Sequence, residues 1–170
     1  MNEEIIPRSL SFKKLFDLKF KNMTNSEALR DLIRINNDRV TGYSKAATQT
    51  DDQDLQSLFT QFAQQSRQFA NDLRRLVSSN EKDVTDETTT AGKIYRAWMD
   101  VKATFGGDDR KGVLASCEFG EDAAQKAYKE ALKEDDLTID VRATIESQKA
   151  ILRQAHDKVK MMRDTAAAHR

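Results

Sequence analysis

Cysteine, proline and glycine are scarce in this sequence of 170 residues, which has one cysteine (Cys117), one proline and six glycines. A single cysteine excludes an intrachain disulfide and any zinc cluster that needs several cysteines. With so little proline and glycine, and with charged residues at 33%, the composition favours long exposed helices over sheets. The length is that of one domain with a substantial core.

A net charge of either sign is also missing, because 28 Lys and Arg residues balance 28 Asp and Glu residues. Proteins that bind nucleic acid usually have a basic surplus, so no nucleic-acid partner is expected. No run of 18 apolar residues is present, which argues against a membrane-spanning helix. The N-terminus has no apolar stretch typical of a secretory signal, and the sequence therefore predicts a cytoplasmic protein.

Apolar residues recur at helical spacing in four long segments, which predicts an all-α, antiparallel four-helix bundle in an up-down-up-down order. The expected helix starts are the capping boxes Thr24-x-x-Glu27 and Thr50-x-x-Gln53, the acidic pair Asp108-Asp109, and the break at Asp135-Asp136. A short extra helix is expected around Trp98, before the third long helix, and Gly106-Gly107 would end it.

The first 22 residues differ from the rest and are interpreted as an N-terminal arm, with the bundle spanning residues 23–167. Apolar residues from Leu10 to Phe20 alternate there with four lysines. One interpretation is a partly ordered arm or a short amphipathic helix on the bundle. The alternative is a basic amphipathic segment, residues 8–21, that docks on a membrane surface or a partner.

Polar residues interrupt the apolar seam near the middle of each long helix. Because mid-helix positions of antiparallel helices share one height, we expect these residues to meet in a central polar layer. Its predicted members are Asn36, Gln65, Ser66, Glu121, Gln148 and His156.

A carboxylate at the seam position of Glu121 needs a partner, because a buried charge without one is costly. One possibility is a metal ion held by Glu118, Glu121 and His156. The other is a closed hydrogen-bond network within the polar layer, or partial exposure of Glu121. The sequence alone leaves both open.

Several stretches resemble a bacterial ferritin-like four-helix-bundle family of unknown function, distantly similar to the YciF-like stress proteins. The most specific are Trp98-Met99-Asp100-Val101-Lys102 and Cys117-Glu118-x-Gly120-Glu121-Asp122. The others are Gly42-Tyr43-x-x-Ala46-Ala47, Gln65-x-x-x-Phe69-Ala70-x-x-Leu73 and His156-Asp157-x-Val159, so that the likeness covers residues 24–166. The resemblance implies the fold and a stress association.

Ferritin-like di-iron proteins use a Glu on each of two helices and Glu-x-x-His on the other two. Here Ser66-x-x-Phe69 and Arg153-x-x-His156 stand where those motifs would lie, so the di-iron ligand set is incomplete. We therefore predict a non-enzymatic protein without a cofactor, acting through self-association or a protein partner. The alternative is a degenerate metal-binding protein with iron or another divalent metal at Glu118, Glu121 and His156.

Overall fold

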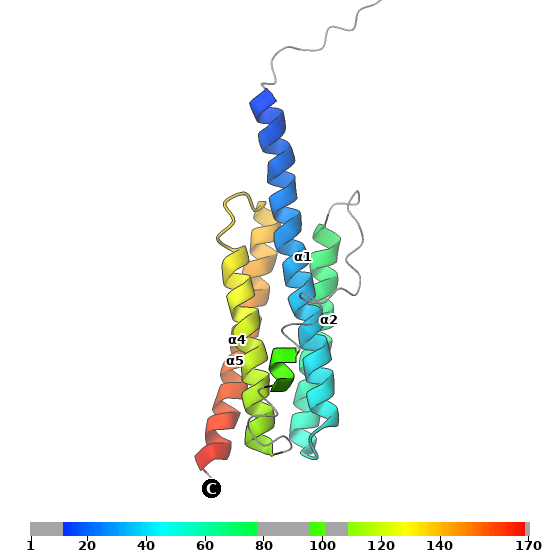
Figure 1. Ribbon diagram of the computed structural model, residues 1–170, viewed down its shortest axis with the longest axis vertical. Coiled ribbons are helices and arrows are strands. Elements are labelled where there is room, and N and C mark those ends of the chain that lie inside the picture. Colours follow the sequence, from blue (N-terminus) through cyan, green and yellow to red (C-terminus); the bar gives the residue numbers. More distant parts are fainter. Residues whose placement is uncertain (1–11, 78–95, 101–108, 169–170) are drawn as a thin grey trace, which may run out of the picture.

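The computed structural model describes the backbone of residues 12–77, 96–100 and 109–168, and within these ranges the side chains of residues 26–166. Four long helices make up nearly all of this part of the chain: α1 (Phe12–Thr48), α2 (Gln53–Leu76), α4 (Arg110–Ala131) and α5 (Ile139–Ala168). They pack side by side as a bundle (Figure 1). The predicted all-α four-helix bundle is confirmed.

The order of the helices in space differs from the up-down-up-down prediction. α1 packs along α2 and α4, and α5 packs along α4 and α2, so that each neighbouring pair is antiparallel while α2 and α4 run in the same direction (Figure 1). The ion pairs of Arg110 with Asp52 and Asp54 hold the starts of α2 and α4 at the same end. The end of α2 and the start of α4 therefore lie at opposite ends of the bundle.

α1 begins at Phe12, so the prediction that the first helix starts at Thr24 is wrong. No proline or glycine occurs between residues 12 and 41, and the residues before Thr24 include leucine and lysine, which favour helix. The helix therefore continues through the capping box and through residue 22. The division of the chain into an arm of residues 1–22 and a bundle of residues 23–167 stays a prediction. Figure 1 shows α1 extending beyond the other three helices at one end of the bundle.

The caps of the next helices follow the predictions in part. Asp109 caps α4 as expected, since its side chain accepts a hydrogen bond from Gly112 N at 2.5 Å. The capping box at Thr50 is wrong, because Asp52 is the N-cap of α2. The hydroxyl of Thr50 instead accepts a hydrogen bond from Asp52 N at 3.2 Å, which closes the turn that precedes the helix.

Two apolar clusters fill the bundle, one toward each end. The cluster at the end with the α4–α5 turn includes Leu29, Leu32, Ile33, Leu73, Ile145 and Leu152. The other includes Tyr43, Leu55, Phe59, Trp98, Leu114 and Val159. Buried polar residues lie between them, among them Asn36, Arg39, Ser66 and Glu121. In the described residues no helix is long and apolar enough to cross a membrane.

Trp98 is the largest fully buried side chain and joins the α2–α4 connection to the core. It lies on residues 96–100, which are helical; the other residues of the predicted short helix lie outside the described ones. Its indole lies against Gly42 of α1 and Gly120 of α4 and contacts the Tyr43 ring edge-on, with centroids 5.1 Å apart. A Cβ on Gly120 would lie 2.1 Å from the indole, and one on Gly42 would lie 2.6 Å from it. Both helices can approach the ring only because these positions lack a side chain.

Because of this close approach, Gly120→Ala should lower the free energy of unfolding. Overpacking a core costs about 1–3 kcal/mol of unfolding free energy, which exceeds the gain of about 1 kcal/mol from better helix propensity. In a Trp98→Ala background the ring is gone, and the same substitution should be neutral or stabilising. Urea unfolding followed by circular dichroism measures both effects, and an equal loss in the two backgrounds would contradict the explanation.

Candidate functional site

The centre of the bundle holds an ion pair between Arg39 of α1 and Glu121 of α4. Arg39 Nη2 donates to Glu121 Oε1 at 2.5 Å, and the two side chains are 1% and 0% exposed. Tyr43 donates its hydroxyl to the same carboxylate oxygen. Arg39 Nη1 donates to Ser66 Oγ of α2 at 2.5 Å, so the guanidinium links three helices.

Electrostatics fix the protonation states of Arg39 and Tyr43. The pKa of Arg39 is raised, because Glu121 and nearby groups outweigh the desolvation that lowers it. Burial, reinforced by the negative charge of Glu121, raises the pKa of Tyr43 well above its usual value. The guanidinium therefore stays charged and the phenol keeps the proton that it donates. Burial also raises the pKa of Cys117, whose thiol is then protonated and a poor nucleophile.

A second string of hydrogen bonds crosses the bundle beside the ion pair. Asn36 Nδ2 donates to Leu32 O and to the Tyr128 hydroxyl, both at 2.8 Å. That hydroxyl donates to Gln148 Oε1 at 2.6 Å, and Gln148 Nε2 donates to Phe69 O at 3.3 Å. The string thus runs from α1 through α4 and α5 to α2.

The six residues of the predicted polar layer do not form a single hydrogen-bonded cluster. Asn36 and Gln148 belong to the hydrogen-bond string, while Ser66 and Glu121 belong to the Arg39 group. Gln65 is half-buried, and its Oε1 has no hydrogen-bond partner in the described part of the chain. His156 lies elsewhere, at the edge between α4 and α5.

Arg39 was not among the predicted layer residues, although helical periodicity could have found it. It lies three residues after Asn36 and four before Tyr43, on the same helix face. A charged residue at a seam position is easily assigned to the surface when its partner on another helix is unknown. The pair Arg39 and Glu121 becomes plausible only when both positions are placed in the core together.

The donor set of the central layer does not fit a pair of metal ions. The groups that meet around Arg39 include one carboxylate, Glu121, together with a hydroxyl, a phenol and the guanidinium itself. Two divalent ions need several carboxylates for charge balance. Here the positive charge opposite the carboxylate is supplied by the protein, and the arrangement is structural.

A second polar cluster lies at the edge where α4 and α5 meet. Glu118, Asp122 and His156 each offer a ligand atom, and the three atoms lie within 4.8 Å of one another. Glu118 and His156 are 9% and 8% exposed, and Arg163 of α5 pairs with Glu118. Of the predicted metal ligands, the structure brings Glu118 and His156 together, while Glu121 is engaged by Arg39. Asp122, one residue further along α4, occupies the third place.

Most of the chain matches a known family. Residues 24–134 match the family model described as a domain of unknown function, DUF2383. The chain belongs to this family. No match was found among curated proteins. The family assignment confirms the domain-of-unknown-function resemblance seen in the sequence, and the match includes both buried partners of the ion pair, Arg39 and Glu121.

The ion pair predicts a non-additive response to substitution. Arg39→Met should lower the free energy of unfolding by about 3–5 kcal/mol, because it leaves a buried carboxylate without its cation. In the double variant Arg39→Met/Glu121→Met neither charge of this pair remains, and stability should recover much of that loss.

Urea unfolding measures the cycle, and Tyr43→Phe serves as its control. That variant removes one hydrogen bond but keeps the ion pair, so its loss should be about 1.5–3 kcal/mol, the range for a hydrogen bond to a charged group. A double variant whose loss equals the sum of the losses of Arg39→Met and Glu121→Met alone would contradict the assignment.

Proposed function

We propose that this DUF2383 protein works by binding rather than by catalysis, as a helical-bundle protein that associates with a second copy of itself through the N-terminal extension of α1. The observation that carries this proposal is the length of α1. It has 37 residues, whereas α2 has 24. At about 1.5 Å per residue, α1 is roughly 20 Å longer than α2.

The N-terminal extension of α1 is expected to be stable only when another surface packs against its apolar face. Its sequence has apolar residues at Phe12, Leu15, Phe16 and Phe20, the spacing of an amphipathic helix. Helical segments of this length are marginal in water unless an apolar face is packed. A second copy provides an identical segment, and a two-fold axis pairs like with like. Self-association therefore explains a helix that extends beyond its own bundle.

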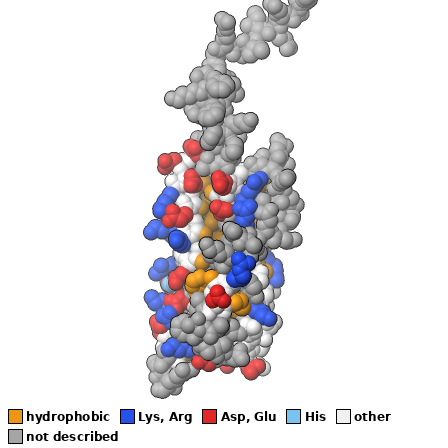
Figure 2. Space-filling model, viewed as in Figure 1, with side chains coloured by type: hydrophobic (Ala, Val, Ile, Leu, Met, Phe, Trp, Pro, Cys, Tyr) orange, Lys and Arg blue, Asp and Glu red, His pale blue; other side chains and the backbone are white. Residues whose placement is uncertain are grey.

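The charge pattern on the visible face of the described residues favours few other partners. Figure 2 shows acidic and basic side chains interleaved over the visible face of the described residues, in keeping with the net charge of zero. Such a surface gives no one-sign field to attract nucleic acid. The central layer is a closed ion pair rather than an open catalytic group, which supports a non-enzymatic role. The resemblance to YciF-like stress proteins supports a stress-associated role. We also propose that the protein acts in the cytoplasm.

Light scattering coupled to size exclusion tests the association. The full-length chain should have the mass of a dimer, and Phe16→Glu should shift the equilibrium to monomer, because a charge in a paired apolar face is costly. Lys13→Glu introduces the same residue at a lysine position of the same segment and should leave the dimer intact.

A monomeric wild-type chain would overturn the proposal, as would a dimer that is unaffected by Phe16→Glu. Co-sedimentation with anionic lipid vesicles covers the membrane alternative. Suppose that the chain is monomeric in the absence of vesicles, binds to vesicles, and loses this binding when residues 1–22 are deleted. Membrane binding would then replace self-association as the function of the extension.

A further inference from the structure

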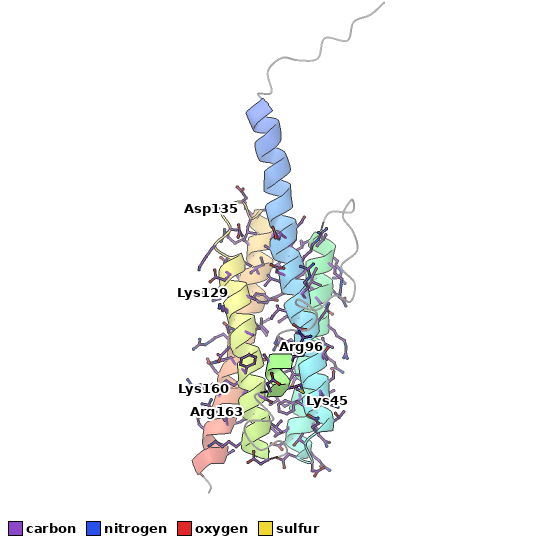
Figure 3. All side chains as sticks on the ribbon, viewed as in Figure 1. Lys45, Arg96, Lys129, Asp135, Lys160 and Arg163 are labelled. Carbon is purple, nitrogen blue, oxygen red and sulfur yellow. The ribbon has the colours of Figure 1, made fainter. Side chains whose placement is uncertain are left out.

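The edge between α4 and α5 has a cluster that the central ion pair and the α1 extension do not involve. Glu118 and Asp122 are four residues apart on α4, and therefore lie on one side of that helix. His156 faces them from α5, with its Nε2 3.1 Å from Asp122 Oδ1. Figure 3 shows α5 beside α4 in this region, with Lys160 and Arg163 labelled on α5.

We infer that Glu118, Asp122 and His156 bind one divalent transition-metal ion, with one nitrogen and two oxygen ligands. Metal–ligand bonds of about 2.0–2.2 Å place neighbouring ligand atoms about 3.4 Å apart in a tetrahedral site. The ligand atoms of this cluster already lie within 4.8 Å of one another. Small rotations of the two carboxylates bring them to the required separation. Two carboxylates and a neutral imidazole also balance the charge of one divalent ion.

The environment of His156 provides the second argument. Its Nδ1 lies 2.9 Å from Asp157 Oδ1, while Nε2 points toward Asp122. A metal-binding histidine almost always donates its other ring nitrogen to a carboxylate or carbonyl, which fixes the tautomer and the ring orientation. Asp157 is in that position. When an ion is bound, Asp157 would accept the Nδ1 proton in a hydrogen bond, and the Nε2 lone pair would be free for the ion.

The site is buried on one side and accessible on the other. The side chains of Glu118 and His156 are 12% and 10% exposed, whereas that of Asp122 is 65% exposed. An ion can therefore enter past Asp122 and keep a water molecule as a fourth ligand. This geometry differs from the centre of the bundle, where Glu121 is fully buried and paired with Arg39.

Arg163 makes the proposal distinguishable from a simple surface ion pair. It donates to Glu118 Oε2 and also pairs with Asp164 at 2.7 Å. An incoming cation must share Glu118 with this guanidinium or displace it. Arg163 then competes with the metal, and its removal should strengthen metal binding.

Calorimetric titration of the full-length, chelator-treated protein with Zn²⁺ tests the site. We expect one ion per chain, and at least about tenfold weaker binding in both His156→Gln and Asp122→Asn. Arg163→Gln should bind Zn²⁺ about threefold more tightly, the effect of removing one partly exposed charge. Circular dichroism melting checks the fold of each variant, and Asp122→Asn, at an exposed side chain, keeps the test valid if His156→Gln does not fold.

Two matched controls accompany the titration. Glu146→Gln neutralises an exposed acid on α5 that is not in the cluster, and His169→Gln removes the other histidine of the chain; both should bind Zn²⁺ as the wild type does. The proposal is overturned if Zn²⁺ gives no stoichiometric binding, or if Asp122→Asn binds as tightly as Glu146→Gln. It is also overturned if Arg163→Gln binds no more tightly than the wild type.

Discussion

The rest of the structure depends on the ion pair between Arg39 and Glu121. Two full charges lie in the middle of the bundle with almost no contact with solvent, a position that is tolerable only when each charge has its partner and its hydrogen bonds. Tyr43 and Ser66 provide those bonds. The requirement fixes the register of α1 against α4, because sliding either helix by one turn would separate the charges. It also divides the apolar core into two clusters, one on each side of the polar level.

The helical architecture could be predicted from the sequence because it depends on local patterns. Apolar periodicity identified the four long helices, and Asp109 was recognised as a cap because a cap acts over three residues. Predictions failed where a local signal competed with a wider context, or where no local signal exists. Thr24 has a capping-box partner, yet the chain on both sides favours helix and α1 continues through it. The parallel directions of α2 and α4 depend on how the helices pack against each other, which no short motif encodes.

The candidate sites were predicted less well, because they depend on how each helix is rotated about its axis. Glu118, Glu121 and Asp122 lie within one and a half turns of α4, and the apolar seam indicated that Glu121 faces the core but not which side chains the three would meet. The structure turns Glu121 inward to Arg39 and leaves Glu118 and Asp122 near His156. A rotation of about 100° per residue separates these two outcomes. Arg39 and Asp122 were missed for the same reason, since the partner of each, Glu121 or His156, lies on another helix that only the fold brings near.

The packing of Trp98 has a consequence for how this protein can be observed. It is the only tryptophan of the chain, it is fully buried, and its indole meets the ring of Tyr43, whose hydroxyl is bonded to Glu121. Fluorescence excited in the indole therefore comes from a single site next to the buried charges. Its emission wavelength reports solvent entry at the centre of the bundle, without any attached dye, and separates opening of the core from fraying of the helix ends.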